Sequence, residues 1–178
     1  MSATEGEEIR IVTWRDTTAP WNAAGQLIAS CSSPQTFTHG DIMAGRADWA
    51  RSATTGLAET IAAEIRSTLE RGHAAVVTAE TPDGDVVGAA WMERHESGGR
   101  VTAVLQDIAV APTSRHRGLG RSILQEVLRV SSAWSATAVL LETSLRNRRA
   151  QQFFTDLGFE PLAMTMFINL PPLPGSSR

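Results

Sequence analysis

Two residue types are missing from the sequence: its 178 residues include neither lysine nor tyrosine, and all 16 basic side chains are arginine. A chain without lysine cannot form a side-chain Schiff base with a carbonyl substrate. It also lacks the lysine that a Walker-type NTPase places on its phosphates. Cysteine is nearly absent, since Cys31 is the only one, and this excludes an internal disulfide and a cysteine-based zinc site.

Long apolar runs and strong charge are absent as well. No run approaches the roughly 18 apolar residues of a membrane-spanning helix, and the acidic start MSATEGEE is unlike a secretory signal. We therefore expect a cytoplasmic protein that does not bind membranes. A net charge of −3 with 6% aromatic residues argues against a nucleic-acid partner. The four histidines show no H-E-x-x-H spacing, and we expect no metal.

What remains is the composition of one ordinary globular domain, 42% hydrophobic and 20% charged. Residues 1–8 are polar and acidic and are expected to be a disordered tail. We expect residues 9–170 to form a single domain and residues 171–178 to be a flexible tail.

Hydrophobic periodicity and helix-breaking residues predict the order of the elements. Strands are expected at 9–14, 73–81, 86–93, 101–111, 138–143 and 159–170. Helices are expected at 20–29, within 41–51, and at 57–71, 118–131 and 147–157. The stretches 101–111 and 138–143 are nearly all apolar, which is typical of central strands covered on both faces. The predicted fold class is α/β, with a mixed sheet flanked by helices and a helical insertion after the first strand.

The most informative stretch lies where the strand at 101–111 ends and a helix begins, with the letters RHRGLGRS over residues 115–122. Small residues let the backbone curl so that successive N–H groups point at one spot, and a helix N-terminus adds partial positive charge there. Arg115, Arg117 and Arg121 can pair with phosphate oxygens. The stretch predicts a pyrophosphate-binding loop, and the plainer alternative is a glycine-capped turn with solvated arginines.

A dinucleotide cofactor is not favoured at this loop. The G-x-G-x-x-G pattern is incomplete, and the preceding strands form an antiparallel meander and not a parallel βαβ unit. A coenzyme with a pyrophosphate and an extended arm fits better, and a nucleotide-phosphate binder is a further alternative.

Two motifs resemble those of the GNAT superfamily of N-acetyltransferases. The acetyl-CoA loop of that family, [QR]-x-x-G-x-[GA], is matched by Arg115, Gly118 and Gly120. The family's second motif, N-x-x-A-x-x-[FL]-Y-x-x-x-G-F, is matched by Asn147, Ala150, Phe153, Gly158 and Phe159. The lead-in 105–112 resembles the bulged fourth strand of the family. The likeness extends from about residue 9 to residue 170 and is weakest over 17–60.

The resemblance implies a GNAT-like acyltransferase fold with a splayed central sheet, and acetyl-CoA as the acyl donor. The pantetheine arm would lie between the splayed fourth and fifth strands, against Ile108, Ala109 and Val110. The pyrophosphate would be held by the loop residues Arg115, His116, Arg117, Gly118, Leu119, Gly120, Arg121 and Ser122. The thiol end would be lined by Asn147, Phe153 and Phe154. The acetyl group would pass directly to an amine, without an acyl-enzyme.

Direct transfer to an amine benefits from a base, because only about 10⁻³ to 10⁻⁴ of a lysine-like amine is neutral at pH 7. The position that matches the family's glutamate in the fourth strand is Gln106, which cannot usefully accept a proton. Asp107 is the candidate base, provided that a bulge redirects its side chain. Glu93 and Glu142 are alternatives. The oxyanion would be bound by the backbone N–H of Val110.

The family usually has a tyrosine where this chain has Phe154, and its hydroxyl is thought to protonate the leaving thiolate. Phenylalanine cannot do so, and general acid catalysis typically contributes about 10²–10⁴-fold. A thiol of pKa about 8.5 is still a tolerable leaving group. The sequence therefore predicts slower turnover, and not necessarily none.

The favoured function is an acetyl-CoA-dependent N-acetyltransferase whose acceptor is a small-molecule amine rather than a protein. The alternative is a non-catalytic acyl-CoA-binding regulatory or scaffold protein of the same fold, because Gln106 and Phe154 both depart from the family pattern. A single last strand at 159–170 would leave an exposed edge, and we therefore expect a homodimer.

Several other residues have both a functional and a plainer interpretation. Large aromatic residues that could line an acceptor pocket, but are more often core, are Trp14, Trp49 and Trp91. The segment expected to cover the acceptor offers Thr38, His39, Asp41 and Trp49. The arginines that could reach a coenzyme phosphate, or simply be solvated, are Arg146, Arg148 and Arg149.

Overall fold

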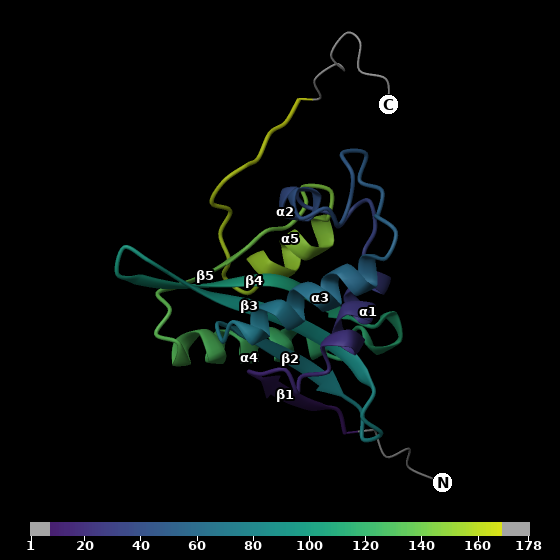
Figure 1. Cartoon of the computed structure of the whole chain (residues 1–178), viewed down its shortest axis with the longest axis vertical. Coiled ribbons are helices and arrows are strands. Elements are labelled where there is room, and N and C mark those ends of the chain that lie inside the picture. The colour runs from purple at the N-terminus through teal and green to yellow at the C-terminus, as the bar shows by residue number, and fades with distance from the viewer. Residues whose placement is uncertain (1–7, 169–178) are drawn as a thin grey trace.

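The computed structural model describes residues 8–168, and its central feature is a five-stranded sheet (Figure 1). In spatial order the strands are β1 (Arg10–Trp14), β2 (Ala74–Glu80), β3 (Val86–Ser97), β4 (Arg100–Val110) and β5 (Ala138–Leu141). Neighbours are antiparallel from β1 to β4, and β5 runs parallel to β4. The mixed sheet that the sequence predicts is therefore present.

Helices cover both faces of this sheet (Figure 1). One face packs against α1 (Trp21–Cys31) and α3 (Leu57–Glu70), and the other against α4 (Leu119–Ala133) and α5 (Arg148–Thr155). The short helix α2 (His39–Met43) lies in the connection between α1 and α3, and a 3₁₀ turn, Pro112–Ser114, follows β4. None of the described helices is long and apolar enough to cross a bilayer.

The two faces of the sheet have separate hydrophobic cores. In α3 the apolar side chains that recur from Leu57 to Leu69 are buried together with Trp91 of β3. In α4 the buried stripe that includes Ile123 packs with Met92 of β3. Trp91 and Met92 are neighbours in the chain, and they enter opposite cores because successive strand residues point to opposite faces.

The helix expected within 41–51 is wrong in position and length, since α2 spans only His39–Met43. A capping box begins it: the Thr38 hydroxyl accepts a hydrogen bond from the Asp41 amide, and the Asp41 carboxylate accepts one from the Thr38 amide. The sequence T-x-x-D is the local signal for this start. Gly45 then adopts a φ of +75° after the helix ends.

The strand expected at 159–170 is not formed over residues 159–168, and residues 169–170 lie outside the described chain. Every residue from 160 to 168 is exposed. As a consequence β5, expected to be a central strand, is an edge of the described sheet, and Leu140 is 43% exposed. The apolar pattern of 138–143 predicts a covered strand, but nothing in the described chain pairs with its outer edge. The expected tails at 1–8 and 171–178 fall outside the described residues except for Glu8.

Candidate active site

The strands β4 and β5 pair over only part of β4. Thr102 to Leu105 pair with Ala138 to Leu141, and the residues that follow in β4, 106–110, have no β5 partner. We call residues 106–110 the open edge of β4. The splayed sheet that the family resemblance implies is therefore present at this position.

A β-bulge begins the open edge. Trp91 of β3 pairs with Asp107, whereas its neighbour Met92 pairs with Leu105, so Gln106 is an extra residue in β4. An extra residue shifts the alternation of side chains by one position. Asp107 consequently lies on the same face of the sheet as Trp91, where its carboxylate meets the indole.

The backbone of the open edge is directed away from β3 at alternate residues. Ala111 donates a hydrogen bond to the Val87 carbonyl of β3, at 2.9 Å. Because backbone groups alternate along an antiparallel pair, the N–H and C=O groups of Ile108 and Val110 point away from β3, and those of Ala109 point toward it. The Val110 carbonyl is in fact contacted from outside the sheet, by the side chains of Arg115 and Cys31.

The loop of residues 115–122, which we call the phosphate loop, joins β4 to α4. Gly118 caps α4 with a φ of +79°, and a Cβ at this position would meet no atom within 4 Å. His116 also has a positive φ, +64°, and is exposed. Within residues 8–168, no backbone acceptor is found for the amides of residues 116–121. The loop therefore presents free N–H groups at a helix N-terminus, as an anion site requires.

The basic side chains around the phosphate loop divide into two groups. Arg115 turns back to the open edge, where its Nε donates to the Val110 carbonyl at 3.0 Å and its Nη2 lies 3.7 Å from Cys31 Sγ. Arg117 and Arg121 are exposed and form no ion pair within the described chain. Arg149 approaches from α5, with Nη2 3.5 Å from His116 Nε2.

The second motif lies beside the same site. Asn147 caps α5 by accepting a hydrogen bond from the Ala150 amide at 3.1 Å, which leaves its side-chain NH₂ group free of that bond. Phe153 is the side chain nearest to Gly120, where an added Cβ would be 3.6 Å from the ring. Phe154 is only 7% exposed and packs edge-on against Phe153.

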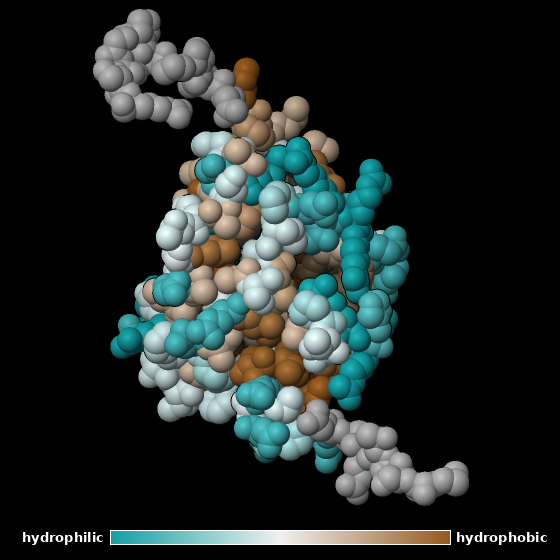
Figure 2. Space-filling view, turned by 90° about the vertical axis from the view of Figure 1, so that its right-hand side faces the viewer, coloured by the Kyte–Doolittle hydropathy of each residue, from teal (hydrophilic) through white to brown (hydrophobic). Residues whose placement is uncertain are grey.

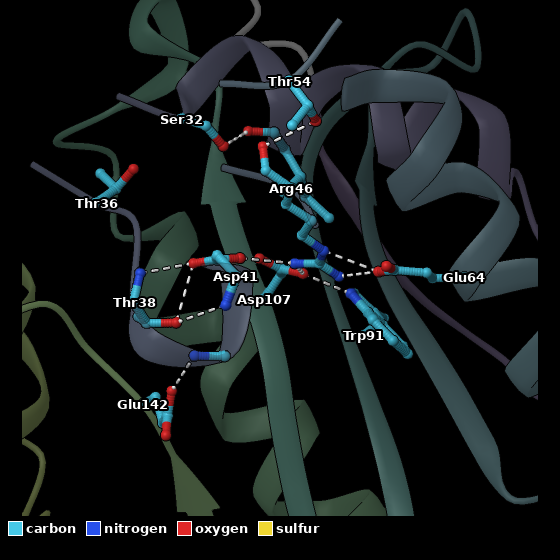
Figure 3. A network of polar contacts seen from close by, with 12 residues as sticks. Ser32, Thr36, Thr38, Asp41, Arg46, Thr54, Glu64, Trp91, Asp107 and Glu142 are labelled. Atoms are coloured by element: carbon cyan, nitrogen blue, oxygen red, sulfur yellow. Dashed lines mark hydrogen bonds and ion pairs between the residues drawn. The ribbon is translucent and has the colours of Figure 1, made fainter. Parts of the chain in front are cut away.

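A buried arginine collects three carboxylates on the α3 side of the open edge (Figure 3). Arg46 is 6% exposed, and its Nη1 lies 2.9 Å from Asp107 and 3.1 Å from Asp41. Its Nε donates to Glu64 of α3 at 2.8 Å. We call these four residues the Arg46 cluster. One positive charge faces three negative ones, so the cluster has an excess of two negative charges when all are ionised.

Burial raises the pKa of Asp107 to about 6, although the charge of Arg46 and the indole hydrogen bond of Trp91, at 2.7 Å, oppose the shift. For Arg46, burial works against the charged form, but the carboxylates of Asp107 and Glu64 outweigh it and raise its pKa. Arg46 is therefore always charged. Asp107 titrates closer to neutrality than an ordinary aspartate.

The segment 38–46 connects the two diverging strands. Arg46 ties its end to Asp107 of β4, and Glu142, directly after β5, accepts a hydrogen bond from the Gly40 amide at 3.0 Å (Figure 3). His39 Nδ1 lies 3.8 Å from the same carboxylate. Glu142, one of the alternative bases, is therefore engaged in holding α2.

A cavity of about 620 Å³ opens between α3 and the sheet, next to the open edge. Its sheet wall includes Trp91, Glu93 and Gln106, and its helix wall includes Glu64 and Arg71. Its size is within the usual range for small-molecule sites, roughly 300–1,000 Å³. The bulged residue Gln106 places the cavity directly beside the strand edge at which the acetyl group is expected.

The comparisons with known proteins agree with this geometry. Residues 46–159, more than half of the chain, match the Acetyltransferase (GNAT) family. The chain belongs to this family. It is accordingly an N-acetyltransferase by class, and its open edge and phosphate loop both fall inside the matched range.

Relatives of the acetyltransferase are distant in sequence. A glucosamine 6-phosphate N-acetyltransferase of Trypanosoma brucei brucei is 27% identical over 106 residues, which cover 56% of this chain and 70% of that protein. The solved aminoglycoside N-acetyltransferase AAC(6')-Iy in complex with CoA is 19% identical, with a TM-score of 0.65 and coverage of 95% and 99% of the two chains. A putative acetyl transferase from Pyrococcus furiosus is 17% identical, with a TM-score of 0.68 and coverage of 92% and 100%. The solved structures support the fold.

The three tryptophans that could line an acceptor pocket or belong to the core differ in their surroundings. Trp14 donates to the Thr78 hydroxyl at 3.0 Å, away from the open edge, while Trp91 lines the cavity and Trp49 is 46% exposed.

Residues 8–168 of the acetyltransferase hold no group of three or more His, Cys, Asp or Glu side chains suited to a metal ion.

Sequence reasoning missed Arg46 and Glu64. No local signal marks them, since the cluster joins α2, α3 and β4, and Arg46 and Asp107 alone are 61 positions apart in the chain. The contact between Trp91 and Asp107 could be found from the sequence, because the turn near Gly98 and one bulge fix the register of β3 against β4. Arg149 could be suspected from its place beside Asn147.

Proposed function

We propose that this acetyltransferase moves an acetyl group from acetyl-CoA to an amine of a small molecule. The observation that carries the proposal is the open edge of β4 beside the phosphate loop, with a buried carboxylate and a cavity at its start. An extended coenzyme needs an anion site and a free strand edge in series, and this stretch of chain offers both.

The coenzyme phosphates are assigned to the free amides of residues 116–121 and to Arg117, Arg121 and Arg149. Open space at Gly118 supports this assignment, because a bound phosphate needs close approach to the backbone. The backbone of Ile108 would bond the pantetheine arm, and Ala109 and Val110 would lie along it, which leaves the Val110 N–H for the oxyanion. Leu119, Gly120, Ser122, Asn147 and the Phe153–Phe154 pair would complete the walls.

In the proposed reaction, Asp107 accepts a proton from the ammonium form of the acceptor, directly or through water. The neutral amine then attacks the thioester carbonyl carbon, and the oxyanion that forms is bound by the Val110 N–H. The attacking nitrogen then releases its extra proton to water, the C–S bond breaks, and CoA leaves as a thiolate, because a thiol of pKa about 8.5 can depart without protonation by a tyrosine. A base with a pKa near the working pH is the most effective kind, and the raised pKa of Asp107 suits it to this role.

The acceptor is proposed to be an amine without a phosphate group. The Arg46 cluster has two excess negative charges when ionised, and Glu93 adds another carboxylate to the cavity wall. Arg71 is the opposing charge, but it already donates to Ser67 and Thr68. Among the relatives' named substrates, this charge balance favours an aminoglycoside over glucosamine 6-phosphate. We further propose that the enzyme acts as a homodimer.

The test is thiol release from acetyl-CoA over a panel of amines. Glucosamine, glucosamine 6-phosphate, an aminoglycoside, a polyamine and a lysine peptide would be compared by kcat/KM. We expect turnover with small unphosphorylated amines, and lower values for the phosphate ester and the peptide. Binding of acetyl-CoA with no turnover on any acceptor would instead show a non-catalytic acyl-CoA binder. Preference for the phosphate ester would refute only the acceptor assignment.

A further inference from the structure

The two carboxylate oxygens of Asp107 have different surroundings (Figure 3). Oδ2 accepts two hydrogen bonds, from Trp91 Nε1 at 2.7 Å and from Arg46 Nη1 at 2.9 Å. No donor within residues 8–168 makes a hydrogen bond to Oδ1. The described part of the chain leaves no buried polar side-chain atom without a partner, so Oδ1 belongs to the accessible part of this side chain, which is 18% exposed. One oxygen is therefore held twice, and the other is open to a proton.

The single N–H group of the Trp91 side chain is used for this bond. Large apolar side chains do reach the surface of this protein, as the hydrophobic residues next to the grey C-terminal atoms show (Figure 2), but Trp91 is only 3% exposed. An indole carries one donor, and a buried donor without an acceptor destabilises the fold. Arg46, in contrast, divides its donors between Asp107, Asp41 and Glu64. Trp91 is therefore the donor dedicated to Asp107.

Regular strands fix this contact. Trp91 of β3 and Asp107 of β4 are direct partners in the antiparallel ladder, just past the bulge at Gln106. Directly opposite residues have Cβ atoms about 4.5–5.5 Å apart, so the indole reaches the carboxylate without a change in the backbone. A group on a strand is held more precisely than one on a loop. Trp91 and Gln106 both line the cavity, and this places the fixed carboxylate next to the proposed acceptor.

We propose that Trp91 is a positioning residue for acetyl transfer, which together with Arg46 fixes Oδ2 of Asp107 and leaves Oδ1 as the atom that takes the proton of the acceptor ammonium. The inference rests on the proposed function, in which Asp107 is the base. An N–H bond of the ammonium breaks, its electron pair stays on the nitrogen, and an O–H bond forms at Oδ1. The amine and the carboxyl group are then both uncharged, and the accessible Oδ1 passes the proton on to water.

The charge around Asp107 comes from several elements. The charged groups of the connection, α2, α3 and β3 that surround it or line the cavity beside it are Arg46, Asp41, Glu64, Arg71 and Glu93. His39 and Glu142 lie together at the start of α2. Burial raises the pKa of Asp107 to about 6, while Arg46 and the Trp91 hydrogen bond lower it and Asp41 raises it. Trp91 is uncharged, so replacing it changes the pKa of Asp107 without changing the number of charges.

The first experiment removes the indole N–H and follows Asp107 without any substrate. Trp91→Phe keeps an aromatic ring but loses the donor, and the matched control Trp14→Phe loses the indole that donates to Thr78 at 3.0 Å. Carbon NMR of the aspartate carboxyl groups, with Asp107 assigned from Asp107→Asn, gives the midpoint of its titration. We expect a midpoint near 6 for the unchanged protein and for Trp14→Phe. Trp91→Phe should move it up by about one pH unit, because a hydrogen bond to the charged form is lost.

Turnover links this titration to the reaction. The acid limb of kcat/KM should move up in Trp91→Phe by the same step as the Asp107 midpoint, and it should stay in place in Trp14→Phe. A midpoint that is equal in the two variants would overturn the proposal, and so would a limb that stays while the midpoint moves. A protein with no turnover on any acceptor would refute the proposed function, and the NMR midpoints would then decide alone whether Trp91 holds Asp107.

A second measurement leaves Trp91 unchanged, and it serves if the Trp91→Phe chain does not fold. The indole N–H signals of the five tryptophans are followed by proton–nitrogen NMR as the pH is varied. One indole signal should titrate with the Asp107 midpoint in the unchanged protein, and this response should disappear in Asp107→Asn. The Trp14 signal, assigned from Trp14→Phe, should not respond. If no indole signal follows the titration of Asp107, the proposal is wrong.

Discussion

Asp107 is the residue whose role depends most on a local irregularity. In a regular strand it would alternate with Gln106, and only one of them would face the cavity side of the sheet. The bulge at Gln106 lets Gln106 line the cavity while Asp107 meets Arg46 and Trp91 on the same face. A single extra residue thus supplies a carboxylate where the family glutamate is replaced by glutamine.

The pH dependence of turnover tests the role of Asp107. A base must be deprotonated to act, so kcat/KM should fall as the pH drops through about 6, the pKa of Asp107. Asp107→Asn should lower kcat by about 10²-fold or more and abolish this limb. The control is Glu93→Gln, which removes a cavity carboxylate but should keep the limb near pH 6. A limb that disappears only in the Glu93 variant would transfer the role to Glu93.

The same pKa has a consequence for stability. Asp107 binds its proton more tightly in the folded chain, at a pKa of about 6, than in the unfolded chain, at about 3.9. Folding stability from this group is therefore fully present below pH 4 and decreases as the pH rises to about 6. The quantity to compare is the unfolding free energy of the unchanged protein minus that of the Asp107→Asn variant. We expect this difference to fall by about 1–3 kcal/mol between pH 4 and pH 6. Urea titrations of both proteins measure it, and a flat difference would contradict the shift.

Single residues differ in how well the sequence reveals them. Gly118 and Asn147 could be predicted because each acts within a few positions of its own element, as a left-handed cap and as a helix cap. Arg46 could not, because its burial depends on carboxylates from α3 and β4 that are distant in the chain. A sequence pattern reveals a residue whose role depends on its neighbours in the chain. The Arg46 cluster is formed by residues of three elements, so no such pattern marks it.

At the scale of elements, the phosphate loop can be tested with two glycines of similar conformation. Gly118 has a φ of +79° and Gly84, in the turn between β2 and β3, has +90°, and a Cβ meets nothing within 4 Å at either. Valine costs similar backbone strain at both positions, about 1–2 kcal/mol. Gly118→Val should weaken CoA binding by about 100-fold or more, and Gly84→Val should leave it unchanged. Calorimetry of both variants measures this, and equal affinities would remove the loop from the coenzyme site.

The connection from α1 to α3 depends on Arg46. Arg46→Ala leaves Asp41, Glu64 and Asp107 together without a cation, and the loss should be about 3–5 kcal/mol of unfolding free energy. The control is Arg129→Ala, which breaks an exposed pair with Glu126 on α4 and should cost less than about 1 kcal/mol. Chemical denaturation gives both values. Equal costs would mean that the Arg46 cluster does not hold this connection.

Most elements follow from sequence periodicity, and the exceptions have physical reasons. The strands β2, β3 and β4 and the helices α3 and α4 carry continuous apolar patterns, and the structure has them within a few residues of the expected bounds. The expected strand at 159–170 has an equally clear pattern. Alternating apolar residues predict a strand with an apolar face, but the partner that covers this face does not follow from the pattern.

At the scale of the molecule, the sheet separates two tasks. The face with α4 and α5 carries the phosphate loop and the aromatic residues near it, and the face with α1 and α3 carries the cavity and the Arg46 cluster. The open edge of β4 lies next to both the phosphate loop and the cavity. The coenzyme and the acceptor are thus expected to approach the same strand from opposite sides of the sheet.

Coenzyme binding should therefore stabilise the whole fold and protect its splayed region. At 100 times its dissociation constant, a ligand of the folded state adds about 2.7 kcal/mol, which for a chain of this size raises Tm by roughly 5–10 °C. Differential scanning fluorimetry should show this rise with CoA, and hydrogen exchange should slow at residues 106–110 and 116–122. Gly118→Val should show neither effect, while Gly84→Val should show both. Protection confined to other segments would place the coenzyme elsewhere on the molecule.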